Sequence, residues 1–206
     1  MMTDTPTFPA FDAIASRIDV LGLHSVGFTS AIRGEGASTI AVGTALALAT
    51  LRRGPVLVVD ANWIQPSLTT DAGLAGAPGL ADHIAGHIDL DSAIRPASQS
   101  GTAFLPIGDR AAARPRLREL TTLLARRDFC ATIVDLPAIL VGEPFVLPWA
   151  SLLDRLFVVL REAATPLPLA RQAIARVSLA TPPDIVLNRG QAQIPRILTR
   201  RLPVRA

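Results

Sequence analysis

Short apolar runs that alternate with helix-like segments constrain the fold of this chain more than any other feature. The clearest run, PVLVVD at 55–60, is apolar at nearly every position and ends in a carboxylate. Strands covered by helices on both faces read as continuous apolar runs of this kind. The sequence predicts about six such strands, over 24–30, 55–60, 102–108, 130–136, 155–160 and 184–188. The expected fold class is therefore α/β, with a mostly parallel central sheet flanked by helices on both faces.

Helix-like segments separate several of these strands. The longest are predicted over 38–53, 114–127 and 168–180. The segment 61–100 is rich in Gly, Pro, Ser and Ala, and it is expected to hold a short helix near 80–88 within loops.

The length of 206 residues suits one substantial domain. We expect a partly disordered N-terminal segment over 1–19, a folded domain over 20–190, and a basic C-terminal tail over 191–206.

Composition and segment lengths bear on where the protein works. The longest nearly apolar stretch, 40–51, is too short for a membrane span, which needs about 20 residues. The N-terminus contains acidic residues and no basic apolar leader, which argues against a signal peptide. A single cysteine excludes an internal disulfide framework. The sequence therefore predicts a cytoplasmic protein.

The sequence GEGAST at 34–39 follows the first predicted strand and opens a helix. Glycines at 34 and 36 allow close approach of the backbone, and amides at a helix N-terminus attract anions. Ser38 offers a hydroxyl to Mg²⁺. The position that carries lysine in a phosphate-binding loop is Ala37, and all 20 basic residues of the chain are arginine. The predicted nucleotide-binding residues of this loop are Gly34, Glu35, Gly36, Ala37, Ser38 and Thr39.

Two aspartates lie at or near the ends of apolar strands. Asp60 ends the run 55–60, and Asp135 lies near the end of 130–136. Open α/β sheets build their sites at the carboxyl ends of strands, and Mg²⁺ prefers oxygen ligands. We therefore predict a metal site from Ser38, Asp60 and Asp135. The alternative for each aspartate alone is that it caps the next turn.

The order of these motifs resembles a known family. TSAIRGEGAST, VLVVDANWIQPSL, GLADHIAG, FLPIGD, LRELTTLLARRDFCATIVDLPAIL and IVLN follow the pattern of the ATPase domain of CpsD/CapB-type proteins. These are bacterial tyrosine kinases and exopolysaccharide co-polymerase partners within the MinD/ParA-like class of P-loop proteins. The resemblance covers roughly residues 20–190 and implies a P-loop NTPase-like fold that binds ATP or ADP with Mg²⁺.

The resemblance assigns roles residue by residue. Asp60 takes the place of the Mg²⁺-associated aspartate and proposed general base, which makes it the candidate catalytic residue. Asn62 replaces the other aspartate of that motif, while Ile64 and Gln65 replace its arginines. DLPA matches a motif that typically reads Asp-Thr-Pro-Pro, which implies a role for Asp135 at Mg²⁺.

Other family positions are changed or lie elsewhere in the chain. Asn188 falls where the class places an asparagine against the adenine base. The lysine that marks the MinD/ParA branch falls at Ile32. The N-terminal glutamate–arginine–arginine motif that assembles the kinases into rings is not recognisable, and only Arg17 is nearby.

These departures predict a protein without kinase or ATPase activity. Loss of one charge-stabilising contact commonly costs on the order of 10²–10³ in rate. A chain without tyrosine also cannot autophosphorylate a tyrosine cluster as the kinases do. We expect a regulatory or assembly subunit of exopolysaccharide or capsule biosynthesis and export, with at most weak nucleotide binding. Its expected partner is a membrane polysaccharide co-polymerase at the inner face of the cell membrane, and a homo-oligomer is a further option.

Two alternatives remain open at this stage. One is an active ATPase in which Arg33 or a partner chain replaces the lysine, and the other is a MinD/ParA-like spatial regulator. A nucleic-acid partner is not expected, because the net charge is only +3 and 4% of residues are aromatic. The arginines at the C-terminal end belong either to a solvated tail or to a surface that docks on an anionic membrane.

Overall fold

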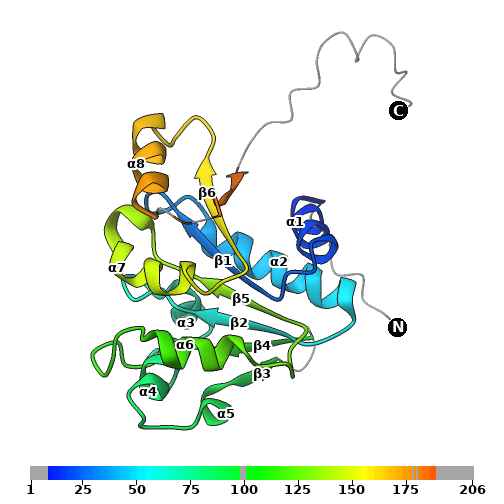
Figure 1. The fold of residues 1–206 in the computed structure, drawn as a ribbon. Helices are drawn as coiled ribbons and strands as arrows, with labels where there is room; N and C mark the ends of the chain where they lie inside the picture. The colour runs from blue at the N-terminus through cyan, green and yellow to red at the C-terminus, as the bar shows by residue number, and fades with distance from the viewer. Residues whose placement is uncertain (1–8, 98–100, 178, 180, 189–206) are drawn as a thin grey trace.

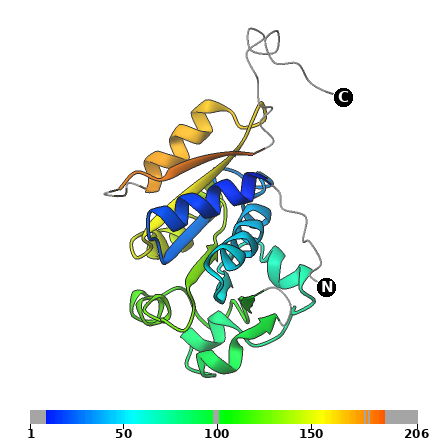
Figure 2. The same ribbon diagram turned by 90° about the vertical axis from the view of Figure 1, so that its right-hand side faces the viewer.

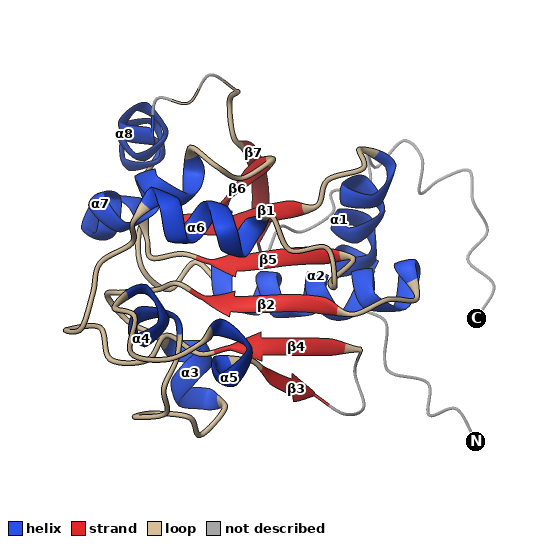
Figure 3. Cartoon of the chain, turned by 60° about the horizontal axis from the view of Figure 1, so that its bottom comes forward, coloured by secondary structure: helices blue, strands red, loops and turns tan. Residues whose placement is uncertain are grey.

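The computed structural model describes residues 9–97, 101–177, 179 and 181–188. Its centre is a seven-stranded sheet with the strand order β3-β4-β2-β5-β1-β6-β7 (Figure 1). The strands are β1 Ser25–Ser30, β2 Val56–Asp60, β3 Arg95–Ala97, β4 Thr102–Leu105, β5 Ala131–Asp135, β6 Arg155–Arg161 and β7 Asp184–Asn188. All neighbouring pairs are parallel except β3 and β4, as the opposed arrows in Figure 3 show. The predicted α/β class and the six predicted strands are confirmed.

The sequence did not predict the edge strand β3. It has three residues, and Pro96 lies at its middle. Proline lacks the N–H that a central strand must donate, so it is confined to sheet edges and bulges. A segment this short, with proline at its centre, carries no strand pattern that can be recognised without the neighbouring β4.

Eight helices surround the sheet in the described part of the chain. They are α1 Pro9–Val20, α2 Ala37–Arg52, α3 Ser67–Asp71, α4 Leu80–Ile84, α5 Leu90–Ala93, α6 Leu117–Leu124, α7 Ile139–Ala150 and α8 Leu167–Val177. The three long predicted helices correspond to α2, α6 and α8, and the short one near 80–88 corresponds to α4. None of these helices is long and apolar enough to cross a bilayer.

The helices divide between the two faces of the sheet. Helices α1 and α2 cover one face, where Phe28 of β1 and Phe157 of β6 stack with ring centroids 5.1 Å apart. Helices α4 to α8 pack on the other face around buried side chains such as Leu57, Val134 and Trp149. Because both faces are covered, the central strands are buried at every position, which explains their continuous apolar sequence.

Most of the predicted N-terminal segment 1–19 is part of the folded unit. Helix α1 lies beside α2 on the same side of the sheet (Figure 2). Ala15 and Ile18 of α1 are buried. The ring of Phe11 lies where a Cβ at Gly43 of α2 would be, with ring atoms 2.5 Å from that position. Residues 1–8 and the predicted tail 191–206 lie outside the described residues.

Candidate functional site

The loop 31–36 connects the end of β1 to the start of α2 at the carboxyl edge of the sheet. Gly34 has φ +80° and Gly36 has φ +94°, so both adopt the left-handed conformation that glycine tolerates best. The N-cap residue of α2 is Gly36, which has no side chain, and no hydrogen bond from the first amides of α2 to another side chain is found among the described residues. The first amides of this 16-residue helix therefore keep their capacity to donate to an anion, together with the favourable end of the helix dipole.

Glu35 braces this loop from inside the protein. Its side chain is buried, with 2% exposure. Its Oε2 accepts a hydrogen bond from the backbone N–H of Ile32 (2.9 Å), and Oε1 accepts from the N–H of Arg161 (3.3 Å) and the hydroxyl of Thr165. These bonds tie the phosphate loop to the turn between β6 and α8. The carboxylate therefore maintains the shape of the loop, whereas the sequence predicted Glu35 as one of the nucleotide-binding residues, which stays a prediction.

Asn188, at the end of β7, contacts the same loop. Its Nδ2 donates a hydrogen bond to the backbone carbonyl of Glu35 at 2.7 Å. A Cβ at Gly36 would lie only 2.3 Å from this nitrogen, so the close approach of Asn188 also requires glycine at position 36. The structure gives Asn188 a contact that supports the loop, while the adenine contact implied by the family resemblance stays a prediction.

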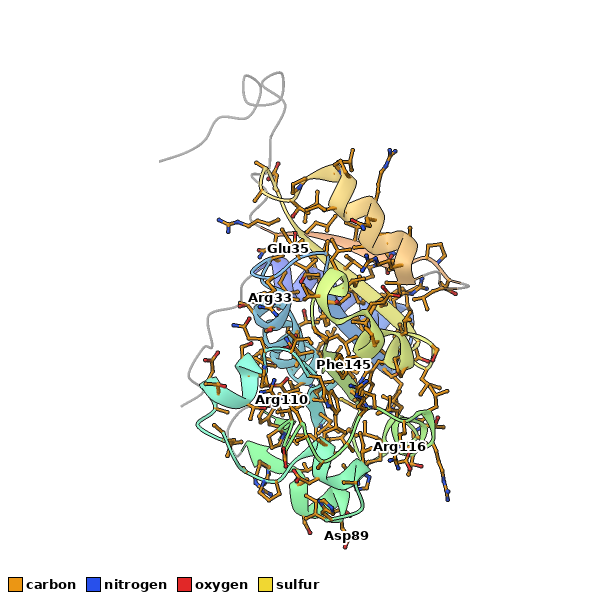
Figure 4. All side chains as sticks on the ribbon, turned by 90° about the vertical axis from the view of Figure 1, so that its left-hand side faces the viewer. Arg33, Glu35, Asp89, Arg110, Arg116 and Phe145 are labelled. Atoms are coloured by element: carbon orange, nitrogen blue, oxygen red, sulfur yellow. The ribbon has the colours of Figure 1, made fainter. Side chains whose placement is uncertain are left out.

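The positions that determine charge at the loop are Ala37 and Arg33. Ala37 is the first residue of α2 and is nearly buried, at 8% exposure, so a methyl group stands where a lysine would begin. Arg33 is exposed and lies beside Glu35 in the phosphate loop (Figure 4). It borders the cavity beside the loop and, within the described residues, has no hydrogen bond or ion pair. Thr39 is exposed and borders the same cavity.

Asp60 and Asp135 lie side by side. They are register partners of the neighbouring parallel strands β2 and β5, and both are fully buried. Asp60 is committed to local structure: its Oδ2 accepts from the N–H and hydroxyl of Thr69, each at 2.8 Å, and its Oδ1 accepts from the N–H of Asn62 at 3.1 Å. Asp60 therefore caps α3, which is the alternative that the sequence left open.

Asp135 differs from Asp60 because neither of its carboxylate oxygens has a hydrogen-bond partner in the described structure. Burial and the adjacent charge of Asp60 raise the pKa of Asp135 to about 8. The nearby hydroxyl of Ser38 lowers this pKa somewhat, although it does not form a hydrogen bond of normal geometry with the carboxyl. Burial also raises the pKa of Asp60, although its hydrogen bonds to Thr69 and Asn62 oppose this effect. A buried carboxyl without partners fits a cation ligand, since a cation would satisfy its oxygens.

The predicted metal set is only partly available in this arrangement. Ser38 lies near Asp135, and its hydroxyl accepts a hydrogen bond from Ser67 at 3.2 Å. Across the described residues, no three His, Cys, Asp or Glu side chains form a group that could hold a metal ion. Asp135 and Ser38 fit Mg²⁺ as ligands, whereas Asp60 would have to exchange its bonds to Thr69.

A cavity of about 810 Å³ opens beside the phosphate loop. At one end it is bordered by loop residues, including Arg33, Gly34 and Ser38. At the other end it continues between α2 and α3 over β2 and β4. The apolar side chains there are Val42, Val58, Leu68 and Phe104. A volume of this size is sufficient for a small organic ligand.

Solved structures with a similar fold include two bacterial kinase domains and a septum site-determining protein. The kinase domain of VpsO superposes with a TM-score of 0.73 and 24% identity, covering 88% of this chain and 94% of that one. The kinase domain of the Escherichia coli tyrosine kinase ETK gives a TM-score of 0.75 and 16% identity, over 94% and 84% of the two chains. The septum site-determining protein MinD from Pyrococcus horikoshii, complexed with Mg-ADP, gives 0.60 and 21%, over 79% and 67%.

The chain has the P-loop fold of the bacterial tyrosine-kinase domains. The expected resemblance to these domains and to MinD/ParA-like proteins is thereby confirmed at the level of the fold. No protein-family description matches the sequence, and no curated protein matches it either.

Within this P-loop fold, the segment after β2 is anchored by contacts of Trp63, a residue for which the sequence left open a partner contact or a loop anchor. Trp63 is 5% exposed, and its Nε1 donates to the carbonyl of Ala113 at 3.0 Å. Its ring stacks on Phe145 of α7 at a centroid distance of 6.0 Å. Arg110 donates a hydrogen bond to the carbonyl of Trp63 at 2.9 Å. Arg110 and Phe145 are both labelled in Figure 4. Trp63 therefore anchors a loop, and only the fold brings its partners together.

Proposed function

We propose that this chain is a catalytically inactive, tyrosine-kinase-like P-loop protein. It acts as a regulatory or assembly subunit in exopolysaccharide or capsule biosynthesis and export. The observation that carries this proposal is a phosphate loop with its left-handed glycines in place but with Ala37 at the lysine position. Because the whole chain lacks lysine, no other lysine of the protein can take over its role.

Binding and catalysis depend on different parts of such a loop. Backbone amides at 34–39 can still hold a diphosphate, since they need no particular side chain. The ammonium that stabilises charge on the transferred phosphoryl group is missing. Mg²⁺, when bound, would neutralise phosphate charge, and Ser38 and Asp135 are the residues that would hold it. Asp60 already accepts three hydrogen bonds, which disfavours its use as a general base.

The proposed partner is a membrane polysaccharide co-polymerase at the inner face of the cell membrane. Support comes from the fold shared with bacterial tyrosine-kinase domains and from the motif order of the sequence. The lack of tyrosine favours a role in assembly over phosphotransfer to the chain's own tail. Genes for glycosyltransferases and an export channel beside this gene would support the polysaccharide role, whereas a cell-division or partition neighbourhood would favour the spatial-regulator alternative.

Phosphate release from ATP tests the loss of catalysis. Purified protein with Mg²⁺ should release no phosphate above a protein-free control. Turnover that disappears in the Asp60→Ala variant would falsify the proposal. Loss of ATP binding in Arg33→Ala, together with measurable turnover in the parent, would support the alternative of an ATPase with a substitute cation.

Restoring the loop cation tests whether the rest of the site is intact. The Ala37→Lys variant should bind ATP at least about tenfold more tightly than the parent in calorimetry, because one well-placed charged contact is worth about 1.4 kcal/mol or more. The matched control Ala47→Lys lies on the same helix α2, away from the loop, and should leave ATP affinity unchanged. An unchanged affinity in Ala37→Lys would show that the site has been lost elsewhere as well.

A further inference from the structure

The cavity beside the phosphate loop has two chemically different ends. The loop end offers backbone amides and the guanidinium of Arg33. The larger apolar side chains at the far end are Val42 of α2, Leu68 of α3, Val58 of β2 and Phe104 of β4. The polar residues of α3 and β4 that also border the cavity are Ser67, Asp71 and Thr102. Val58 is 5% exposed, and the other three apolar side chains are half-buried, so this far end is a groove that is open to a ligand without displacing core side chains.

The groove lies on the opposite side of the loop from the expected adenine position. In the sheet, β4 and β2 lie on one side of β1, whereas β6 and β7 lie on the other. Asn188, which the family resemblance places against adenine, is on β7 and already donates to the carbonyl of Glu35. A nucleotide directed toward β7 would therefore leave the groove over β2 and β4 empty, so the groove needs another explanation.

The charged residues around the cavity also differ between its loop end and its far end. Of the described residues that border it, three are charged: Arg33, Glu35 and Asp71. The Glu35 carboxylate is used inside the loop by Ile32, Arg161 and Thr165. Asp71 is exposed at the end of α3. The positive end of the cavity is thus the phosphate loop. Ser38 borders the cavity there, and the fully buried Asp135 carboxyl lies near Ser38.

We propose that this cavity binds an anionic amphiphile, namely a phosphate or diphosphate ester of a long apolar chain. The phosphate groups lie on the loop amides at 34–39, and the chain lies along the groove between α2 and α3. This inference rests on the proposed function, because it uses the same phosphate loop. The ligand of that loop is then a lipid-like phosphate, and not a nucleotide that the protein hydrolyses.

Calorimetry with soluble probes tests the ligand class. Farnesyl diphosphate, used below its micelle concentration with Mg²⁺, should bind at least about tenfold more tightly than inorganic diphosphate, because each buried methylene adds affinity. Farnesol, which lacks the phosphates, should bind at least about tenfold more weakly than farnesyl diphosphate. Equal affinities for the two diphosphates, or tighter binding of ADP than of farnesyl diphosphate, would overturn the proposal.

Variants in the groove test the position of the chain. Val42→Gln puts a polar group into the groove and should weaken farnesyl diphosphate at least about tenfold while leaving inorganic diphosphate within about twofold. The control Leu51→Gln is on the same helix, is 47% exposed and lies away from the cavity, so it should change neither. Ala72→Trp fills the groove from an exposed position and should act like Val42→Gln without disturbing the core.

The outcomes separate this inference from the proposed function. Unchanged farnesyl diphosphate affinity in both groove variants would overturn the amphiphile site, while leaving the absence of ATP turnover as it stands. Turnover of ATP that depends on Asp60 would overturn the proposed function, and it is read by phosphate release rather than by calorimetry. Thermal unfolding of each variant establishes that a loss of binding does not reflect a loss of fold.

Discussion

At the scale of single residues, burial of the Asp135 carboxyl makes the stability of the protein depend on pH. Its pKa is raised from an ordinary value of 3.8 to about 8. Below about pH 4 the carboxyl is protonated in both folded and unfolded chains. Between about pH 4 and 8 the unfolded chain releases its proton while the folded chain keeps it. Stability must therefore fall as pH rises through this window and level off above it.

The Asp135→Asn variant should remove this pH dependence. Relative to the parent, its free energy of unfolding should rise between pH 5 and pH 8 by on the order of 2 kcal/mol, and by no more than ~4 kcal/mol over three pH units. Urea denaturation at the two pH values without Mg²⁺ gives the difference, and any constant effect of the amide cancels. Asp71→Asn, at an exposed position, is the control. A parent whose stability rises from pH 5 to pH 8 as much as the variant's would contradict the expectation.

Glu35 is the second residue whose role the structure defines. Its two oxygens accept from three donors, whereas a glutamine at this position would present an NH₂ group to one side of the same donors. Glu35→Gln should lower the free energy of unfolding by about 1–3 kcal/mol, because a buried donor is left unsatisfied. It should also weaken diphosphate binding, because a hydrogen bond that fixes the conformation of the loop is lost. Denaturation and calorimetry measure the two effects. Glu143→Gln, which removes a 3.4 Å ion pair with Arg176 near the surface, should cost less than about 1 kcal/mol.

At the scale of secondary-structure elements, predictability followed the periodicity of the sequence. β2 and β5 are buried at every position, so their apolar runs identified them. The sequence did not predict helix α7, which contains Pro144 and Pro148, residues that are unfavourable inside a helix. In the structure Gly142, with φ −130°, interrupts the helix, so Pro144 falls in the first turn of the second part, where its missing N–H costs little.

The candidate site shows the same limit of sequence reasoning. The strand ends placed Asp60 and Asp135 at one edge of the sheet, and their register pairing follows from the parallel order. The sequence could not show that Thr69 donates hydrogen bonds to the Asp60 carboxylate while the Asp135 carboxylate has no partner in the described structure. Thr69 lies on α3, which is only five residues long and has no periodic pattern. The bonds of Glu35 to Arg161 and Thr165 join positions more than a hundred residues apart, which only the fold brings together.

At the scale of the whole molecule, α1 connects the start of the chain to the last described strand. Arg17 of α1 forms an ion pair with Asp184 of β7 at 3.0 Å. The next residue of this helix, Ile18, is fully buried. Helix α1 ends at Val20, so the predicted boundary at residue 20 falls at the end of this helix, and we propose that α1 belongs to the domain. Removal of α1 would expose the apolar side of α2, so we expect α1 to unfold together with the sheet.

The Ile18→Ala variant tests this unity of the fold. Truncation of a fully buried isoleucine should lower the free energy of unfolding by about 2–5 kcal/mol, because it removes buried apolar surface and leaves a cavity against α2. Val20→Ala on the same helix is the matched control: its side chain is 85% exposed, and the change should stay within about 0.5 kcal/mol. Urea denaturation followed by both tryptophan fluorescence and circular dichroism should give one coincident transition for each variant. An Ile18→Ala effect as small as that of Val20→Ala would mean that α1 is an appendage, and the domain would then begin after it.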